Sequence, residues 1–242
     1  MTELMVNGFA IDGYAEHEMS IFHRPDDESD VFCSKWPHDI DVVRPLLWID
    51  PQLWVIFMLR DARDVIVSRH PQDPEVYWTN LGLWKRYTRF ARRLAEHPRF
   101  VTVRYEDLVR DPDCVQHTIA RRLPFLEVKA PFSTYHQSAK PSERSADALR
   151  GVRPLDAQSI GRWRLHKPRV AAQLRLHGPL GRDLIYHKYE VNEEWLAELA
   201  GIEPDHFESK RLPRQPLEQM RRTWRRYKNV VQYALGRSRQ IR

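Results

Sequence analysis

Two side chains that could bind a phosphate flank a short apolar segment in the first third of the chain. A hydrophobic run, Leu53 to Leu59, ends abruptly at Arg60, and Ser68 is the only hydroxyl on the segment that follows. A guanidinium can grip a phosphate through two parallel hydrogen bonds, and a nearby hydroxyl can supply a third. Arg60 and Ser68 therefore form a candidate clamp for a phosphate monoester. The alternative interpretation is an ion pair between Arg60 and Asp64 that pins a helix to the strand.

The elements around this clamp are predicted to alternate between strands and helices. Gln52 to Leu59 has the length and apolar character of a buried strand, and Asp61 can cap a helix that continues to about His70. Ligands of open parallel sheets collect at the carboxyl ends of strands, where Arg60 lies and where the next helix begins. The same patterns predict further strands at 31–36 and 100–104, and helices at 2–9, 42–48, 74–97, 114–123 and in the segment from 161 to about 200. This alternation favours an α/β fold with a mostly parallel sheet and helices on both faces.

Two further motifs stand beside predicted elements. Arg104 to Leu108 reads RYEDL at the end of a strand, and Ser159 to Trp163 reads SIGRW after residues 133–158, which we predict to be a mobile loop or lid. The order R-D-x-R-D-x-x-x-S, then R-Y-E-D-L-x-x-D-P, then S-I-G-R-W resembles that of the sulfotransferases that use 3′-phosphoadenosine 5′-phosphosulfate. We interpret Trp163 as a packing residue, because large aromatic side chains are mostly buried.

The resemblance covers roughly the first 200 residues and implies a P-loop-NTPase-like, three-layer α/β/α fold. It assigns Arg60 and Ser68 to the 3′-phosphate of the nucleotide, in agreement with the clamp inferred from the residues themselves. It also places Tyr105 near the adenine and makes the SIGRW segment a loop that closes over the nucleotide. Ser159 and Arg162 are then the candidates for further phosphate contacts.

The resemblance also implies groups for the transfer step. Lys35 resembles the lysine that faces the bridging oxygen between phosphate and sulfonate, where a fixed cation stabilises charge that develops in the transition state. A general base must take the proton from the acceptor hydroxyl, and Glu16 is the first candidate. Glu18, His17 and His38 remain alternatives, and the acidic segment could equally be a solvated loop.

One element of the resemblance is missing from this sequence. The family has a Gly/Ser/Thr-rich loop between its first strand and first helix, whose backbone N–H groups bind the 5′-phosphosulfate. The sequence begins MTELM, which predicts the helix after that loop, so the first strand and the loop are expected to be missing. A truncated or misassigned start is one interpretation, and a remnant that has lost sulfonate binding is the other.

The leading hypothesis is a sulfotransferase that acts on a hydroxyl acceptor, either a carbohydrate or a lipid-linked molecule. Its donor would be 3′-phosphoadenosine 5′-phosphosulfate and its product adenosine 3′,5′-bisphosphate. No metal is expected, because arginine, lysine and backbone dipoles would handle the charge. The alternative is a non-catalytic nucleotide-binding or polyanion-binding remnant of the same fold. The sequence indicates neither the acceptor nor the oligomeric state.

Composition places the chain among globular proteins. It has 242 residues, of which 42% are hydrophobic and 30% are charged, and it has no apolar run long enough to span a membrane. Its first residues lack the pattern of a secretory signal. The two cysteines, Cys33 and Cys114, lack metal-ligand spacing and suit a reducing compartment, so we expect a cytoplasmic protein.

The basic charge is concentrated at the C-terminus. From Lys210 to Arg242 the sequence has eleven Lys or Arg and one acid, so this segment carries +10 and the remainder about −4 of the total of +6. We therefore predict two parts, a sulfotransferase-like domain over 1–205 and a basic amphipathic tail over 206–242. The apolar residues that recur at helical spacing in the tail are Met220, Trp224, Tyr227, Val231 and Ala234.

Such a tail suits a peripheral anionic membrane surface or a polyanionic acceptor. The alternative is that its aromatic stripe docks on the domain and the arginines are solvated. Nucleic acid is not expected as a partner, because the body of the chain is acidic. A protein that binds nucleic acid through the tail alone is the third hypothesis, which deletion of residues 210–242 would test.

Overall fold

The computed structural model describes residues 1–23, 29–70, 73–139, 152–210 and 216–240. By its internal contacts the chain divides into two compact units. Unit 1 comprises Met1–Met58, Phe90–Asp156 and Arg214–Arg242, and unit 2 comprises Leu59–Arg89 and Ala157–Pro213. Each unit is therefore built from segments that are far apart in the sequence.

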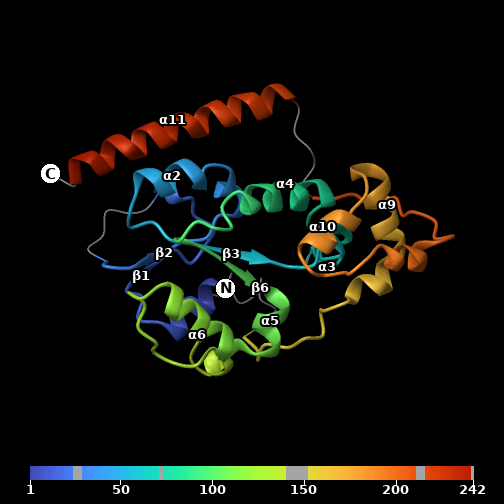
Figure 1. The fold of residues 1–242 in the computed structure, drawn as a ribbon, viewed down its shortest axis with the longest axis horizontal. Helices are drawn as coiled ribbons and strands as arrows, with labels where there is room; N and C mark the ends of the chain where they lie inside the picture. The colour runs from blue at the N-terminus through green and yellow to red at the C-terminus, as the bar shows by residue number, and fades with distance from the viewer. Residues whose placement is uncertain (24–28, 71–72, 140–151, 211–215, 241–242) are drawn as a thin grey trace. The chain divides into compact units, whose positions relative to one another are not determined.

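Unit 1 contains most of the strands and the longest helix (Figure 1). Its strands are β1 (Gly13–Tyr14), β2 (Phe32–Cys33), β3 (Val55–Leu59, whose last residue begins unit 2) and β6 (Phe100–Arg104). Its α-helices are α1 (Thr2–Gly8), α2 (Val43–Ile49), α5 (Tyr105–Arg110), α6 (Pro112–Arg122), α7 (Tyr135–Ser138) and α11 (Pro216–Gln240). Its 3₁₀-helices are η1 (Ile21–His23), η2 (Pro37–Asp41) and η3 (Phe132–Thr134).

The strands of unit 1 form two small sheets. β1 pairs with β2 in parallel, with Gly13 opposite Phe32 and Tyr14 opposite Cys33. β3 pairs with β6, and the two arrows point the same way (Figure 1). The predicted strands at 31–36, 52–59 and 100–104 are thus confirmed, the first two in shorter form.

Unit 1 has two apolar clusters. The larger one combines α1, β6, α5 and α6, and its buried members include Phe9, Val103, Ile119 and Phe132. The rings of Phe9 and Phe132 meet edge to face at 5.5 Å between centroids. The smaller cluster joins α11 to α2 and is described with that helix below.

Unit 2 is mainly helical. Its α-helices are α3 (Ala62–Ile66), α4 (Leu81–Arg92, which continues into unit 1), α9 (Lys167–His177) and α10 (Gly181–Tyr186). Its remaining elements are the strands β4 (Arg69–His70) and β5 (Asp73–Tyr77) and the 3₁₀-helices η4 (Arg162–His166) and η5 (Glu194–Leu199).

The prediction of a single helix over 74–97 was wrong in its first part. β5 pairs antiparallel with β4, and its last residue, Tyr77, also exchanges backbone hydrogen bonds with Glu208 (3.1 Å) and Lys210 (2.8 Å). Partners on both sides satisfy the backbone of this segment, so tertiary pairing overrides the helical spacing of its aromatic residues. The helix begins only at Leu81, where the Asn80 side chain accepts a hydrogen bond from the Leu83 N–H (2.9 Å).

The described residues thus form a mixed α/β fold with small parallel sheets and a helical C-terminus, which confirms the predicted class at this level. The predicted tail contains α11, which groups with unit 1, and the division at residue 205 stays a prediction. Residues 140–151 of the predicted lid lie outside the described residues. Along the described chain, no helix combines the length and apolar character that crossing a bilayer requires.

Candidate functional site

Arg60 lies directly after β3, at the strand end that the sequence predicted. Its guanidinium is half-buried, and Nη2 donates a hydrogen bond to the carbonyl oxygen of Ser159 at 2.8 Å. Its own carbonyl accepts a hydrogen bond from the indole Nε1 of Trp84 in α4 at 3.0 Å. The strand-end arginine is therefore fixed by α4 through its backbone and reaches the SIGRW segment through its side chain.

Asp61 caps the short helix that follows. Its carboxylate accepts a hydrogen bond from the Arg63 N–H (2.8 Å), which confirms the predicted cap. The same carboxylate receives two hydrogen bonds from the Arg63 guanidinium, from Nη2 at 2.7 Å and from Nε at 3.1 Å. A cap that is itself clamped by a bidentate arginine sets the direction of the chain as it leaves Arg60.

Arg63 is buried between aromatic rings. Its Cζ lies 4.5 Å from the ring centre of Trp163 and 4.8 Å from that of Trp195, and its Nη1 pairs with Glu190 at 2.6 Å. Burial acts to lower the pKa of Arg63, but Asp61 and Glu190 outweigh it, and the pKa is raised. Arg63 therefore stays charged as a structural centre of unit 2.

Asp64 joins two motifs that are nearly a hundred residues apart. Its Oδ2 accepts a hydrogen bond from the Gly161 N–H (2.8 Å), and its Oδ1 accepts one from the Trp163 N–H (2.9 Å). Burial raises the pKa of this carboxyl, while the two N–H groups and the charge of Arg60 act against the rise. Asp64 thus anchors the SIGRW segment. The alternative ion pair between Arg60 and Asp64 stays a prediction.

The SIGRW segment is a tight turn with one buried and two accessible predicted residues. Gly161 has φ of +72°, a left-handed conformation in which a side chain is strained. Trp163 is 1% exposed and packs edge to face on Trp195, so the prediction of a packing role is confirmed. Arg162 is exposed and Ser159 is half-buried, so both can reach a ligand.

Ser68 does not lie on a helix, contrary to the prediction. α3 ends at Ile66, after which the chain enters the β4–β5 hairpin. The N–H of Ser68 donates to Val65 (3.3 Å), and its carbonyl accepts from the Trp78 N–H (2.8 Å). The backbone of Ser68 is therefore fixed by the hairpin, and its side chain is exposed.

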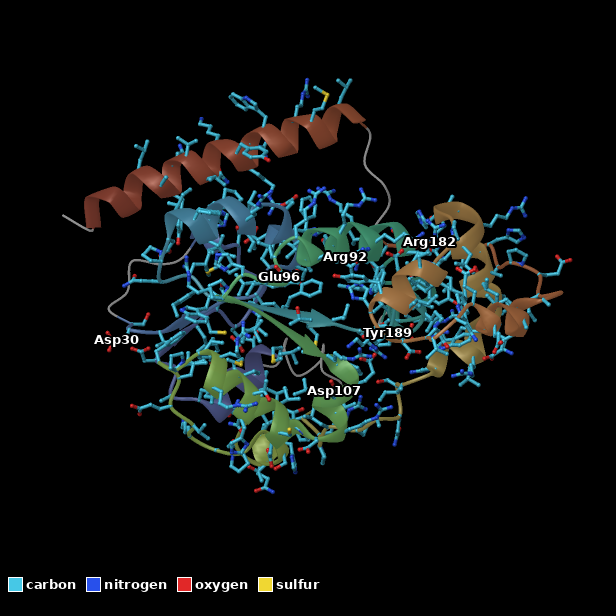
Figure 2. The ribbon with its side chains drawn as sticks, viewed as in Figure 1. Asp30, Arg92, Glu96, Asp107, Arg182 and Tyr189 are labelled. Carbon is cyan, nitrogen blue, oxygen red and sulfur yellow. The ribbon has the colours of Figure 1, made fainter. Side chains whose placement is uncertain are left out.

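Tyr105 belongs to unit 1 and is half-buried at the start of α5, directly after β6. The neighbouring acids have structural surroundings: Glu106 is buried, and Asp107, labelled in Figure 2, lies 3.9 Å from the Arg104 guanidinium. These surroundings indicate a structural role for the two acids at the end of the strand.

Lys35 and the acidic segment meet at the ends of β1 and β2. Lys35 is exposed two residues after β2, and its Nζ lies 3.9 Å from Glu18 Oε1. A backbone hydrogen bond from the Met19 N–H to the Lys35 carbonyl (3.1 Å) keeps the two segments together. Glu16, the first choice for a base, is exposed on the same segment, and Glu18 forms an ion pair with the lysine.

The other candidates for a base have different surroundings. His17 is exposed, and His38 is half-buried in η2 with its ring edge-on to Trp36 at 5.5 Å.

Burial raises the pKa of the nearby Cys33 thiol to about 11, so this thiol stays protonated at neutral pH and is not a nucleophile. Across the described residues, no group of three or more His, Cys, Asp or Glu side chains is arranged to hold a metal ion.

Sequence reasoning missed a second buried arginine that supports unit 2. Arg169 donates to four oxygens, the carbonyls of Ile66, Thr79 and Phe207 and the hydroxyl of Ser209, at 2.6 to 3.3 Å. Its guanidinium also lies 4.2 Å from the ring centre of Tyr77. No sequence signal separates Arg169 from the many solvated arginines, whereas Asp64 could have been found as the second acid of the R-D-x-R-D motif.

A comparison with protein families gives a match over about the first half of the chain. The model of the sulfotransferase family matches residues 10–129, a span that includes Glu16, Lys35, Arg60, Ser68 and Tyr105. The SIGRW turn lies outside the matched span, and the hydrogen bonds of Asp64 connect it to that span. Searches of curated proteins and of solved structures found no match.

Proposed function

The chain belongs to the sulfotransferase family, and from that premise we propose that it transfers a sulfonate group from 3′-phosphoadenosine 5′-phosphosulfate to a hydroxyl of a carbohydrate or lipid-linked acceptor. The family implies a P-loop-NTPase-like, three-layer fold, which we propose for the whole domain. The observation that carries the proposal is the attachment of the SIGRW turn to the segment after β3. Arg60 holds Ser159, and Asp64 holds Gly161 and Trp163.

The nucleotide-binding roles follow from this attachment. Arg60 and Ser68 bind the 3′-phosphate, and Ser159 and Arg162 add contacts from the turn. These two arginines and two serines suit an anion, because all four belong to unit 2. Arg162 and Ser68 are also exposed to solvent, where a ligand can reach them. Tyr105 packs against the adenine with its half-buried ring.

The transfer step needs a cation for the leaving group and a base for the acceptor. Lys35 stabilises the negative charge that develops on the phosphate oxygen as its bond to sulfur breaks. Glu16 takes the proton from the acceptor hydroxyl as the hydroxyl oxygen forms its bond to sulfur. The contact between Glu18 and Lys35 supports Glu18 as the alternative base, and His17 and His38 follow. Separate Glu16→Gln and Glu18→Gln variants distinguish the two carboxylates, because only loss of the base lowers turnover while nucleotide binding is kept.

We place the protein in the cytoplasm, a location supported by its two free cysteines. Its proposed partners are the donor nucleotide, the hydroxyl acceptor and an anionic membrane surface contacted by residues 210–242. The second candidate function is a non-catalytic nucleotide-binding or polyanion-binding remnant. The solvent exposure of Lys35 and of the acidic segment favours this candidate. Binding of nucleotide without transfer to any acceptor would support that candidate.

Calorimetric titration with adenosine 3′,5′-bisphosphate tests the nucleotide site. We expect micromolar binding by the unaltered chain and a loss of at least about tenfold in Arg60→Ala, because a charge-assisted contact to phosphate contributes about 1.5–3 kcal/mol. Arg182→Ala is the matched control, since Arg182, labelled in Figure 2, is an exposed arginine of unit 2 with no role in the proposed site. Absence of heat from the folded chain, or equal binding by the two variants, would overturn the proposed site.

A further inference from the structure

The C-terminal helix α11 docks on unit 1 through one side only. Val230 is buried against Val42 and Leu46, and the hydroxyl of Tyr233 donates to the carboxylate of Asp50. The helix lies along α2 (Figure 1) and also contacts η1. The docked side is therefore defined by packing as well as by hydrogen bonds.

An arginine reinforces the docked side. Arg226 is buried, and its guanidinium pairs with Asp39 (2.7 Å) and Asp41 (2.5 Å) of η2. Burial raises the pKa of Asp39, and hydrogen bonds from Ile21 and Ser20 and the charge of Arg226 act against the rise. Breaking such a buried pair is costly, so α11 stays docked by this side.

The opposite side of α11 is an exposed apolar row, which overturns the alternative that the aromatic stripe docks on the domain. Figure 2 shows side chains that project from the helix on the side away from α2. The members of the exposed row recur at steps of three and four and are 56–73% exposed: Leu217, Met220, Trp224, Tyr227, Val231 and Leu235. This spacing places them along one side of a helix.

Basic residues border the exposed row. Arg221, Arg225 and Lys228 are all exposed, and the sequence has no acid between residues 219 and 240. An apolar row that contains a tryptophan and a tyrosine, beside a basic border, has the composition of helices that lie in the plane of a membrane interface. Two copies of this helix would instead bring their basic borders together, with no acid between residues 219 and 240 to pair with them.

We propose that the exposed row enters the interfacial region of an anionic lipid bilayer while Arg226 keeps α11 docked on unit 1. This inference rests on the membrane contact proposed for residues 210–242 and adds to it the face that makes the contact. The helix lies in the membrane plane, its row replaces water by lipid, and its basic border contacts the anionic headgroups. The protein therefore binds the membrane as a folded body, without release of its tail.

Co-sedimentation of the full chain with lipid vesicles tests the proposal. We expect binding to phosphatidylcholine vesicles that contain about 30% phosphatidylglycerol and little binding to phosphatidylcholine alone. The triple variant Arg221→Gln/Arg225→Gln/Lys228→Gln should bind the anionic vesicles on the order of a hundredfold more weakly, at about fivefold per basic residue. Equal binding to both kinds of vesicle, or no binding by the unaltered chain, would overturn the membrane contact.

A matched pair of leucine variants tests the exposed row itself. Leu235→Glu should weaken binding about tenfold or more, whereas Leu176→Glu should leave it unchanged, although the two leucines are 62% and 69% exposed. Trp224→Glu should behave like Leu235→Glu, with unaltered thermal unfolding and nucleotide binding as checks on the fold and the nucleotide site. Equal vesicle binding by the two leucine variants would overturn the role of the row. So would a dimer in analytical ultracentrifugation that Leu235→Glu converts to a monomer, since a second copy would then be the occupant.

Discussion

The two units of this chain hold their candidate functional groups in different ways. In unit 2 the candidate nucleotide contacts rest on buried charges: Asp64 holds the SIGRW turn, and Arg63 and Arg169 hold the surrounding segments. In unit 1 the candidate transfer groups Glu16 and Lys35 are exposed, and the ion pair of Lys35 with Glu18 is long, at 3.9 Å. We therefore expect nucleotide binding at the proposed site to depend on the stability of unit 2, whereas changes to the transfer groups should have little effect on stability.

The largest loss of stability is expected from Arg63→Ala. It would leave Asp61 and Glu190 without their buried partner, at a cost of about 3–5 kcal/mol in the free energy of unfolding measured in urea. The exposed Arg164, which pairs with Glu198, is the control and should cost less than about 1 kcal/mol when replaced by alanine. Similar losses of unfolding free energy in the two variants would contradict the distinction between a buried arginine that supports unit 2 and a solvent-exposed one.

Arg226→Ala is the counterpart in unit 1 and should cost about 3 kcal/mol, because Asp39 and Asp41 lose their buried partner. Its neighbour Arg225 is exposed on the same helix, so Arg225→Ala should change stability by less than about 0.5 kcal/mol. We also expect Arg226→Ala to keep its affinity for adenosine 3′,5′-bisphosphate, whereas Arg63→Ala should lower that affinity. Loss of affinity in both would contradict the assignment of the phosphate contacts to unit 2.

Asp64→Asn should cost about 1–3 kcal/mol in unfolding free energy, because one side-chain oxygen is replaced by an N–H donor that faces a backbone N–H. The loosened turn should also weaken adenosine 3′,5′-bisphosphate binding about tenfold. Asp107→Asn, at an exposed acid of α5, controls for the change of charge. Retention of full affinity in Asp64→Asn would show that the turn does not contribute to binding.

A smaller effect is expected on the pH dependence of unit 2. Burial, together with Arg69 and Arg162, lowers the pKa of His166. As the pH falls below about 6.5, the unfolded chain binds a proton at this histidine before the folded chain does. The free energy of unfolding therefore decreases until the pH reaches the lower pKa of the folded state. His166→Gln should therefore flatten the fall in the melting temperature between about pH 7 and pH 5. An equally steep fall in the melting temperature of His166→Gln would contradict this prediction.

The smallest change in stability is expected from Lys35→Ala, at less than about 0.5 kcal/mol, since its ion pair is long and exposed. Turnover should nevertheless fall on the order of 10²–10³-fold if an acceptor is supplied, because charge on the leaving oxygen loses its cation. Lys129→Ala, an exposed lysine of the same unit, is the control for both measurements. A large loss of stability in Lys35→Ala would contradict the comparison between the units.

Local sequence signals predicted the segments that surround the candidate site but not what fixes them. The apolar run that ends at Arg60 and the capping Asp61 were readable, because strand length, charge and cap chemistry are local properties. The end of α3 before Ser68 and the strand over 73–77 depend on hairpin pairing and on contacts with Glu208 and Lys210, which no local pattern contains.

The orientation of α11 was equally beyond local reasoning. Its apolar spacing allowed an inward aromatic stripe, yet the other side faces inward. There Arg226 pairs with Asp39 and Asp41, which come from a segment far earlier in the sequence. The burial of Arg63, Arg169 and Asp64 likewise depends on long-range partners. A helical period indicates that a face is apolar, and only the partners decide whether that face is covered.

The interruption of unit 2 by residues 90–156 also sets an order of assembly during synthesis. The segment 59–89 leaves the ribosome first, but Asp64 cannot receive its two hydrogen bonds until Gly161 and Trp163 have been added. Contacts over such separations form slowly, because a long loop must close before they stabilise the fold. Until then Arg63 lacks its contacts with Glu190 and Trp195. The charged and aromatic side chains around Arg63 are therefore not yet packed together in the nascent chain.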